Sequence, residues 1–207
     1  MRNQYWRGIV LCNRWKQANE RLKGELMQYH PWNDQEEKDR EELMKWLSGD
    51  RNVWTRENTA AHLTASAWVT STDRNQILMA YHRIYQSWSW LGGHADGDAD
   101  LLQVALKEVR EESGVHSVRP LSERIFSLEI LCVEGHEKRG IYVPSHLHLN
   151  VTYLLEADPK DELCIREDEN SAVQWFSLSE AVNASSEPWF RKRIYSKLNA
   201  KMKFERI

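Results

Sequence analysis

Acidic side chains are concentrated in one stretch of the 207-residue sequence, from Asp96 to Glu112. This stretch has six acidic and two basic residues, whereas the remainder of the chain has 25 acidic and 26 basic residues. Glu108, Glu111 and Glu112 stand three and four positions apart, so they share one face if the segment is a helix. Carboxylate oxygens suit Mg²⁺ and Mn²⁺, which commonly bridge to substrate phosphates. The cluster therefore predicts a divalent-cation site, with a solvated glutamate-rich helix face as the alternative.

Histidines form a second set of residues that could do chemistry. His146 and His148 alternate in an apolar segment, so their side chains point to the same face of a predicted strand. His94 lies just before the acidic stretch. A His-x-His pair can bind zinc, but the sequence shows no evident third ligand. Contact with substrate or phosphate, ordinary positions on a sheet surface, and metal binding are therefore three open interpretations.

The acidic residues lie on a helix that the sequence predicts over residues 100–113. Asp100 and Gln103 have the spacing of a capping box, and Gly114 stands where a left-handed C-terminal cap belongs. Glycines and aspartates before residue 100 predict a loop that leads into this helix. Apolar residues at helical spacing predict its buried face: Leu101, Leu102, Ala105, Leu106 and Val109.

Strands and further helices surround this segment. Alternating small or apolar and polar side chains predict a half-buried strand over residues 61–70, with a turn at 73–75 and a partner strand at 76–82. Further strands are predicted at 125–133, 146–155 and 172–176, and helices at 179–183 and 189–204. We expect the basic side chains of the last helix to form an exposed face. This mixture predicts an α/β or α+β fold.

The first fifty residues are rich in helix-forming residues. Between Trp15 and Trp46 two helical stretches flank the segment His30-Pro31-Trp32-Asn33-Asp34, where proline and asparagine favour a break and a new cap. We therefore expect an N-terminal helical extension over residues 1–55, packed on the main domain or on a second copy. The main domain is predicted over residues 56–207, and a homodimer is an open alternative.

Composition limits the class of protein. Hydrophobic residues make up 41% of the chain and the formal net charge is only −3, which argues against a nucleic-acid partner. The longest apolar run, residues 77–81, is far too short to span a bilayer, so no membrane association is expected. Three scattered cysteines show no metal or disulfide spacing, which predicts a reducing, cytoplasmic location.

The segment from Gly93 resembles the Nudix box, in which a glycine, a glutamate and an Arg-Glu pair precede a Glu-Glu pair, a glycine and an aliphatic residue. Seven positions match it in register without a gap: Gly93, Glu108, Val109, Glu111, Glu112, Gly114 and Val115. The box arginine is Lys107 here and the first box glutamate is Ala99. Lys107 can form single-point ion pairs but not bidentate ones. In this resemblance Gly93, Lys107 and Gly114 support the motif.

Two phrases extend the resemblance to a bacterial, MutT-like group of Nudix hydrolases: GGHADGD from Gly92, and SHLHL from Ser145. The resemblance implies an α/β/α sandwich around a mixed sheet. It also implies hydrolysis of the pyrophosphate linkage in a small-molecule nucleoside diphosphate derivative, by water attack on phosphorus. The implied cofactor is Mg²⁺, with Mn²⁺ as the alternative.

The resemblance also implies roles for particular residues. The implied metal ligands are the Gly92 carbonyl, Glu108, Glu111 and Glu112, and the implied base is Glu108, Glu112 or Glu169. Glu169 is chosen because family members place a carboxylate several residues before a tryptophan that opens a late strand, here Trp175. Its neighbours Glu167 and Asp168 are alternatives. The predicted substrate contacts are His94, His146, His148 and Trp88, although Trp88 could instead pack in the core.

Two other function classes stay open. A non-catalytic Nudix module that binds a nucleotide and regulates another protein is conceivable because Ala99 and Lys107 depart from the box. An isoprenoid diphosphate isomerase would share the fold but needs a catalytic cysteine. The cysteines of this chain are Cys12, Cys132 and Cys164, and none lies in a recognised motif.

Overall fold

A computed structural model describes residues 2–138, 140–166 and 168–204, and their side chains from residue 15 onward except that of Lys138. The described chain divides into two compact units. The first unit takes the residues up to Thr64 with His94–Ala99 and Leu128–Asn150, and the second takes Ala65–Gly93, Asp100–Ser127 and the residues from Val151 on.

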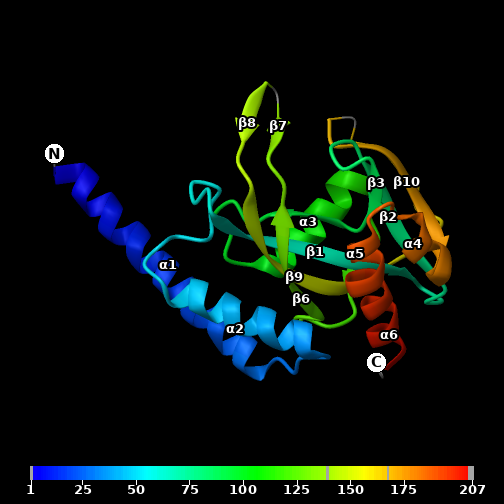
Figure 1. Ribbon diagram of the computed structural model, residues 1–207, viewed down its shortest axis with the longest axis horizontal. Helices are drawn as coiled ribbons and strands as arrows, with labels where there is room; N and C mark the ends of the chain where they lie inside the picture. Colours follow the sequence, from blue (N-terminus) through cyan, green and yellow to red (C-terminus); the bar gives the residue numbers. More distant parts are fainter. Residues whose placement is uncertain (1, 139, 167, 205–207) are drawn as a thin grey trace. The chain divides into compact units, whose positions relative to one another are not determined.

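The described chain contains an eight-stranded mixed sheet and helices, labelled in Figure 1, which confirms the predicted fold class. The strand order is β10-β2-β1-β9-β5, with β3 paired to β2, β4 to β1 and β6 to β9. The strands of this sheet are β1 Ala61–Ser71, β2 Gln76–His82, β3 Ser87–Ser89, β4 Leu91–His94, β5 Arg119–Pro120, β6 Ser127–Val133, β9 His146–Ala157 and β10 Asn170–Ser177. The helices are α1 Arg2–Gln28, α2 Asp34–Ser48, α3 Leu101–Ser113, α4 Leu178–Ala184, α5 Pro188–Phe190, the π-helical turn η1 Arg191–Tyr195 and α6 Ser196–Phe204. Among the described helices, none combines the length and apolar character that a membrane crossing requires.

The first unit contains the predicted pair of N-terminal helices. Asn33 caps α2 by accepting a hydrogen bond from the amide of Glu36, as the break at residues 30–34 predicted. The Asn19 side chain joins α1 to α2 and to the segment after it, because its Nδ2 donates to Leu47 O at 2.8 Å while its Oδ1 accepts from Trp54 Nε1 at 2.8 Å. In the same unit, the paired strands β7 His136–Lys138 and β8 Ile141–Val143 form a hairpin (Figure 1).

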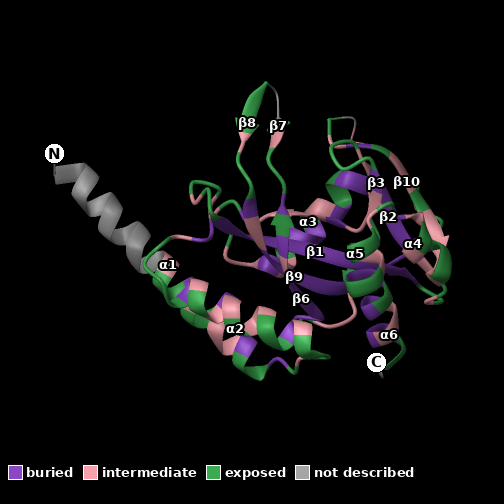
Figure 2. Ribbon diagram, in the orientation of Figure 1, coloured by how far each residue is buried: buried purple, intermediate pink, exposed green. Residues whose placement is uncertain are grey.

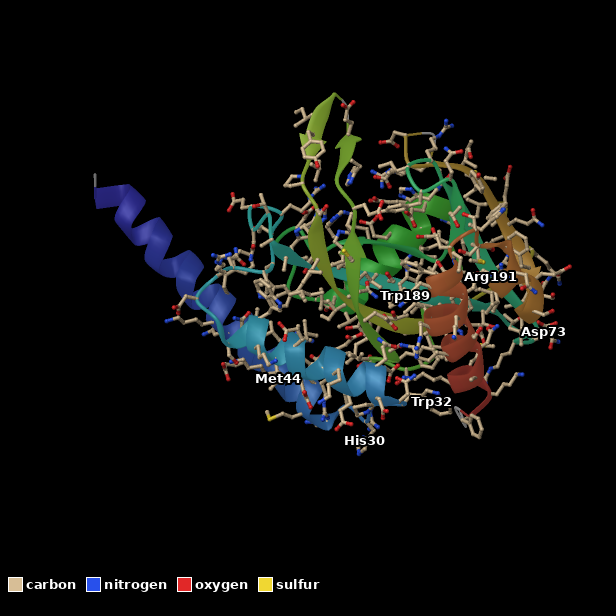
Figure 3. All side chains as sticks on the ribbon, in the orientation of Figure 1. His30, Trp32, Met44, Asp73, Trp189 and Arg191 are labelled. Carbon is tan, nitrogen blue, oxygen red and sulfur yellow. The ribbon has the colours of Figure 1, made fainter. Side chains whose placement is uncertain are left out.

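The expectation of a half-buried strand over residues 61–70 was wrong, because every residue of β1 is buried (Figure 2). Two of its polar side chains tolerate burial because they find partners. Thr64 Oγ1 donates to Asn150 Oδ1 at 2.9 Å, and Thr70 Oγ1 donates to the carbonyl oxygen of Gln76 at 3.3 Å. The turn after β1 forms where Asp73, labelled in Figure 3, accepts hydrogen bonds from Ser71 Oγ and the amide of Asn75.

The second unit contains helix α3, whose predicted ends are confirmed. The Asp100 side chain accepts from the amide of Gln103, and Gly114 ends the helix with a left-handed φ of 75°. The single helix predicted over residues 189–204 is instead divided into α5, η1 and α6, with Trp189 and Arg191 near its start (Figure 3).

The basic residues of this C-terminal segment were expected on an exposed face, and this was wrong for two of them. Lys197 and Lys201 are both buried, and Lys201 Nζ lies 5.4 Å from the ring centroid of Phe126. A lysine stem packs well against apolar surface while its ammonium group contacts an aromatic face.

Candidate functional site

Helix α3 supplies two of the carboxylates in the site. Its apolar side chains Leu101, Ala105, Leu106 and Val109 are buried, as predicted. The prediction was wrong for Leu102, which is half-buried, and Val104 is buried instead. Glu108 and Glu112 are one turn apart, and Glu112 is only 6% exposed although it carries a carboxylate. The side chain of Glu111, the remaining acid of the predicted cluster, points to more open surroundings and is 40% exposed.

Two glycines allow the backbone to approach these carboxylates. The segment around Gly92 and Gly93 was predicted as a loop, but both residues lie in strand β4, and this correction matters for the site. The Gly92 amide donates to Glu112 Oε2 at 3.0 Å. A Cβ atom at position 93 would lie 2.5 Å from Cδ of Glu108, closer than any real contact of that kind. The absence of a side chain there is therefore required for the position of Glu108.

A third carboxylate comes from the segment just before strand β10. Carboxylate oxygens of Glu108, Glu112 and Glu169 all lie within 4.8 Å of one another. Asn170 fixes this segment to α3, because its Nδ2 donates to the carbonyl oxygen of Glu112 at 2.9 Å. The sequence predicted this strand over residues 172–176, whereas β10 begins at Asn170, directly after Glu169.

Arg166 is the cation of this cluster, and sequence reasoning did not single it out. Its guanidinium lies 3.1 Å from Glu111, 3.3 Å from Glu169 and 3.9 Å from Glu108, and also 3.4 Å from Asp168. Among the described residues, Lys107, at the position of the box arginine, pairs with Glu111, at 3.7 Å. The only sequence signal for Arg166 was its place beside the acidic residues that precede β10. Glu167, one of the alternative carboxylates, lies outside the described residues.

Two carboxylates of the cluster, those of Glu112 and Glu108, are held in an environment that disfavours their charge. Burial raises the pKa of Glu112 well above its usual value, against the opposing effect of the Gly92 amide, and Glu108 and Glu169 add to the rise. The pKa of Glu108 is also raised, first by burial and then by repulsion from Glu111 and Glu169. A bound cation would favour the charged forms of all these groups.

The predicted histidines gather in the first unit. One ring nitrogen from each of His62, His94 and His148 lies within 4.8 Å of the other two, and His146 Nε2 lies 3.2 Å from His148 Nε2. A third partner for the His-x-His pair was not evident from the sequence because His62 and His94 are distant from that pair along the chain. The only signal for His62 was its polar position in the strand at residues 61–70.

Comparison with known proteins decides the family. A model of the NUDIX domain matches residues 60–198, which is more than half of the chain. The chain belongs to the NUDIX domain family. The match confirms the family that the box predicted, and the general enzyme class of that family is the Nudix-type pyrophosphohydrolase. Among curated proteins, none matches this chain.

Solved structures of other Nudix proteins resemble this one. An Ap4A hydrolase of C. elegans, in a binary complex, is 17% identical with a TM-score of 0.49, over 69% of this chain and 95% of that chain. A NUDIX-family hydrolase from Clostridium perfringens is 17% identical with a TM-score of 0.47, over 67% and 97%. A MutT structure from work on Aliivibrio salmonicida and Vibrio cholerae is 11% identical with a TM-score of 0.42, over 68% and 98%. The family assignment rests on the domain model and not on these likenesses.

Trp88, the remaining predicted substrate contact of this Nudix chain, lies in the second unit. Its half-buried ring meets the rings of Tyr81 and Phe176 edge to face, at centroid distances of 5.6 and 4.8 Å. These contacts are typical of core packing, which was the alternative interpretation. Among the cysteines that an isomerase would need, Cys132 and Cys164 are exposed, and the side chain of Cys12 lies outside the described residues.

Proposed function

We propose that this Nudix protein hydrolyses the pyrophosphate linkage of a nucleoside diphosphate joined to another moiety, with Mg²⁺ held by the carboxylate cluster. The observation that carries the proposal is the convergence of Glu108, Glu112 and Glu169 within 4.8 Å. Two come from the box helix and the third from a segment more than fifty residues away in sequence. Mn²⁺ is the alternative ion, because it accepts the same ligands.

The residues present fit a hard divalent cation. The donors are carboxylate oxygens, and the predicted Gly92 carbonyl would add a backbone oxygen of the kind such ions accept. Glu112 is nearly buried and has a raised pKa, so a nearby double positive charge would stabilise its ionised form. Glu111 was also predicted as a ligand, and its carboxylate accepts a hydrogen bond from Arg166 at 3.1 Å.

When bound, the ion would lower the pKa of a coordinated water and neutralise charge on the substrate phosphates. The carboxylates of the chain must then accept the proton that water loses as it attacks phosphorus and the pyrophosphate P–O bond breaks. The Glu112 carboxylate is the least accessible and is oriented by the Gly92 amide. The side chains of Glu108 and Glu169 are 14% and 29% exposed, so water can approach them. We therefore assign the base to Glu108 or Glu169 and a ligand role to Glu112.

The test is Mg²⁺-dependent product release from a panel of nucleotide sugars, dinucleoside polyphosphates and deoxynucleoside triphosphates. Glu112→Gln keeps the size and the hydrogen bond from Gly92 but removes the charge, so turnover should fall at least about 100-fold. Glu123→Gln is the matched control, because Glu123 is exposed and lies outside the cluster. It should keep the wild-type rate.

The outcomes separate the two function classes. Turnover of a panel member that requires Mg²⁺ and Glu112 supports the hydrolase. If the wild-type chain binds a nucleotide tightly but turns over no panel member, the chain is instead the non-catalytic module that Ala99 and Lys107 left open. Full activity of Glu112→Gln would contradict the assigned site.

A further inference from the structure

Four histidines of the first unit form one cluster, and none of them belongs to the carboxylate site proposed for the hydrolysis. His62 lies in β1, His94 ends β4, and His146 and His148 begin β9. The ring centroid of His62 lies 5.1 Å from that of His94, 4.8 Å from that of His146 and 5.1 Å from that of His148. The centroids of His94 and His148 are 4.9 Å apart. The lone pairs of imidazole nitrogens packed this closely need either hydrogen-bond donors or a shared cation.

Backbone hydrogen bonds hold the three segments in place, so the cluster does not depend on flexible side chains alone. The amide of Ala95, next to His94, donates to Leu63 O at 3.0 Å. The amide of Leu147, between the two histidines of β9, donates to Ala60 O at 2.9 Å. Each contact involves a residue within two positions of His62. Preorganisation of this kind lowers the cost of assembling ligands around an ion.

Backbone carbonyl oxygens determine the tautomer of two of the rings. His62 Nδ1 lies 3.1 Å from the carbonyl oxygen of Asn58, and His146 Nδ1 lies 2.8 Å from that of Pro144. A carbonyl oxygen can only accept, so each Nδ1 carries the proton and each Nε2 presents a lone pair. Histidine ligands of metals are commonly oriented in this way, with the other ring nitrogen donating to a backbone carbonyl.

The Nε2 atom of His62 has no hydrogen-bond partner in the described part of the chain, although the residue is only 4% exposed. Burial of an unpaired acceptor is unfavourable. The Nε2 atoms of His146 and His148 are 3.2 Å apart, close to the roughly 3.3 Å between two nitrogen ligands about 2.05 Å from a tetrahedral zinc ion. A proton shared by that pair would still leave the lone pair of His62 without a donor.

We propose that His62, His94 and His148 bind one zinc(II) ion, with His146, whose Nε2 lies 3.2 Å from that of His148, as the candidate fourth ligand. The donors are neutral imidazoles, which suit zinc and related transition metals, whereas Mg²⁺ prefers oxygen. Ring nitrogens within 4.8 Å of one another require only small side-chain rotations to reach zinc–ligand geometry. The site is a second metal centre, distinct in ligand chemistry from the carboxylate cluster.

The protonation state of the rings agrees with this geometry. Burial, followed by repulsion from His94, His62, His146 and His136, lowers the pKa of His148 to about 2. Burial also lowers the pKa of His62. The imidazoles of His62 and His148 therefore favour the neutral form, which metal binding requires.

The direct test is titration of the chelator-stripped full-length chain with Zn²⁺ in competition with a chromophoric chelator. The wild-type chain should bind one equivalent at this site. His62→Ala and His148→Ala should each weaken binding by at least about 100-fold, since even the loss of groups that orient metal ligands costs roughly 10- to 100-fold. His116→Ala, which changes an exposed histidine outside the cluster, should leave it unchanged.

Glu112→Gln distinguishes this site from the carboxylate cluster and should retain the zinc affinity. Loss of zinc binding in Glu112→Gln, with binding retained in the histidine variants, would overturn the proposal. Cobalt substitution in the unaltered chain gives a readout that does not depend on how the variants fold. Intense visible bands of four-coordinate Co²⁺ with nitrogen ligands support the site, and the weak spectrum of octahedral, oxygen-bound Co²⁺ contradicts it.

Discussion

Arg166 lies among the carboxylates of the cluster, whereas Lys107 stands at the position of the box arginine. Among the described residues, the Lys107 ammonium pairs with Glu111, at 3.7 Å. Arg166 comes from the segment before β10 and lies within 4 Å of Glu108, Glu111 and Glu169. A guanidinium can serve several carboxylates because it has five donors in one plane. Arg166 therefore offsets the negative charge of these carboxylates from a different part of the second unit.

Arg166→Ala should destabilise the metal-free chain by roughly 1–2 kcal/mol, because the substitution leaves mutually repelling carboxylates without their cation. Partial solvation of the guanidinium limits this loss. Saturating Mg²⁺ should recover most of this loss, since the ion supplies the missing positive charge. Lys107→Ala should cost less than about 0.5 kcal/mol, as expected for an exposed pair. Urea unfolding with and without Mg²⁺ measures both effects. An Arg166→Ala loss that is equal in the two conditions contradicts this role for the guanidinium.

At the scale of elements, helix α3 could be predicted from the sequence, and the carboxylate cluster around it could be predicted only in part. Helix α3 has its cap at Asp100, its apolar stripe and its terminal Gly114 within fifteen residues, so local sequence determines its ends. The third carboxylate, Glu169, was located through the family resemblance, because spacing cannot show which distant segment reaches a helix. Arg166 and His62 were missed for the same reason.

Strand boundaries near the site were less predictable. The glycines of β4 favour a loop when they are considered locally, yet tertiary pairing with β1 makes them a strand. Full burial of β1 was also missed, because its alternating polar residues resemble a solvated face until partners such as Asn150 are known. Pairing between distant strands decides both features, and no local pattern contains that information.

Gly93→Ala should disrupt the site at the level of strand β4. The new Cβ would lie 2.5 Å from Glu108 Cδ, so the Glu108 carboxylate must move by about an ångström. A displacement of that size in a catalytic group can cost about 100-fold in rate, so kcat should fall at least tenfold. Gly24→Ala in α1 is the control, because no atom lies within 4 Å of its Cβ and alanine favours helix. Wild-type kcat in Gly93→Ala would show that Glu108 does not need this close approach.

The loop that follows α3 gives a prediction about pH. Asp161 accepts hydrogen bonds from the amides of Ser117 and His116, and these bonds, Ser117 first, lower its pKa below 3.8. Because the folded-state pKa is depressed, this contribution to stability is present above the unfolded-state pKa and is lost as pH falls through the folded-state value. The stability difference between the wild type and Asp161→Asn should therefore shrink between about pH 5 and pH 2. Urea unfolding across this range measures it, and a constant difference would argue against the hydrogen-bonded carboxylate.

At the scale of the whole molecule, each proposed metal site lies within one compact unit. The histidine cluster belongs to the unit that contains the N-terminal helices, and the carboxylate cluster belongs to the unit that contains α3 and β10. An ion that binds only the folded form of a unit stabilises that unit by mass action. Zinc and magnesium should therefore stabilise the protein through different residues, and thermal unfolding can separate their effects.

Zn²⁺ at 100 times its dissociation constant should add about 2.7 kcal/mol, which raises Tm by roughly 5–11 °C for a cooperative chain of this size. His62→Ala should abolish the zinc shift and keep the magnesium shift, and Glu112→Gln should do the reverse. If the two units unfold in separate transitions, the chain has no single Tm. Each ion should then raise the midpoint of one transition only. Scanning calorimetry of the stripped chain with each ion distinguishes these cases. Zinc and magnesium shifts that both depend on Glu112 alone would place both ions in the carboxylate cluster and contradict the two-site arrangement.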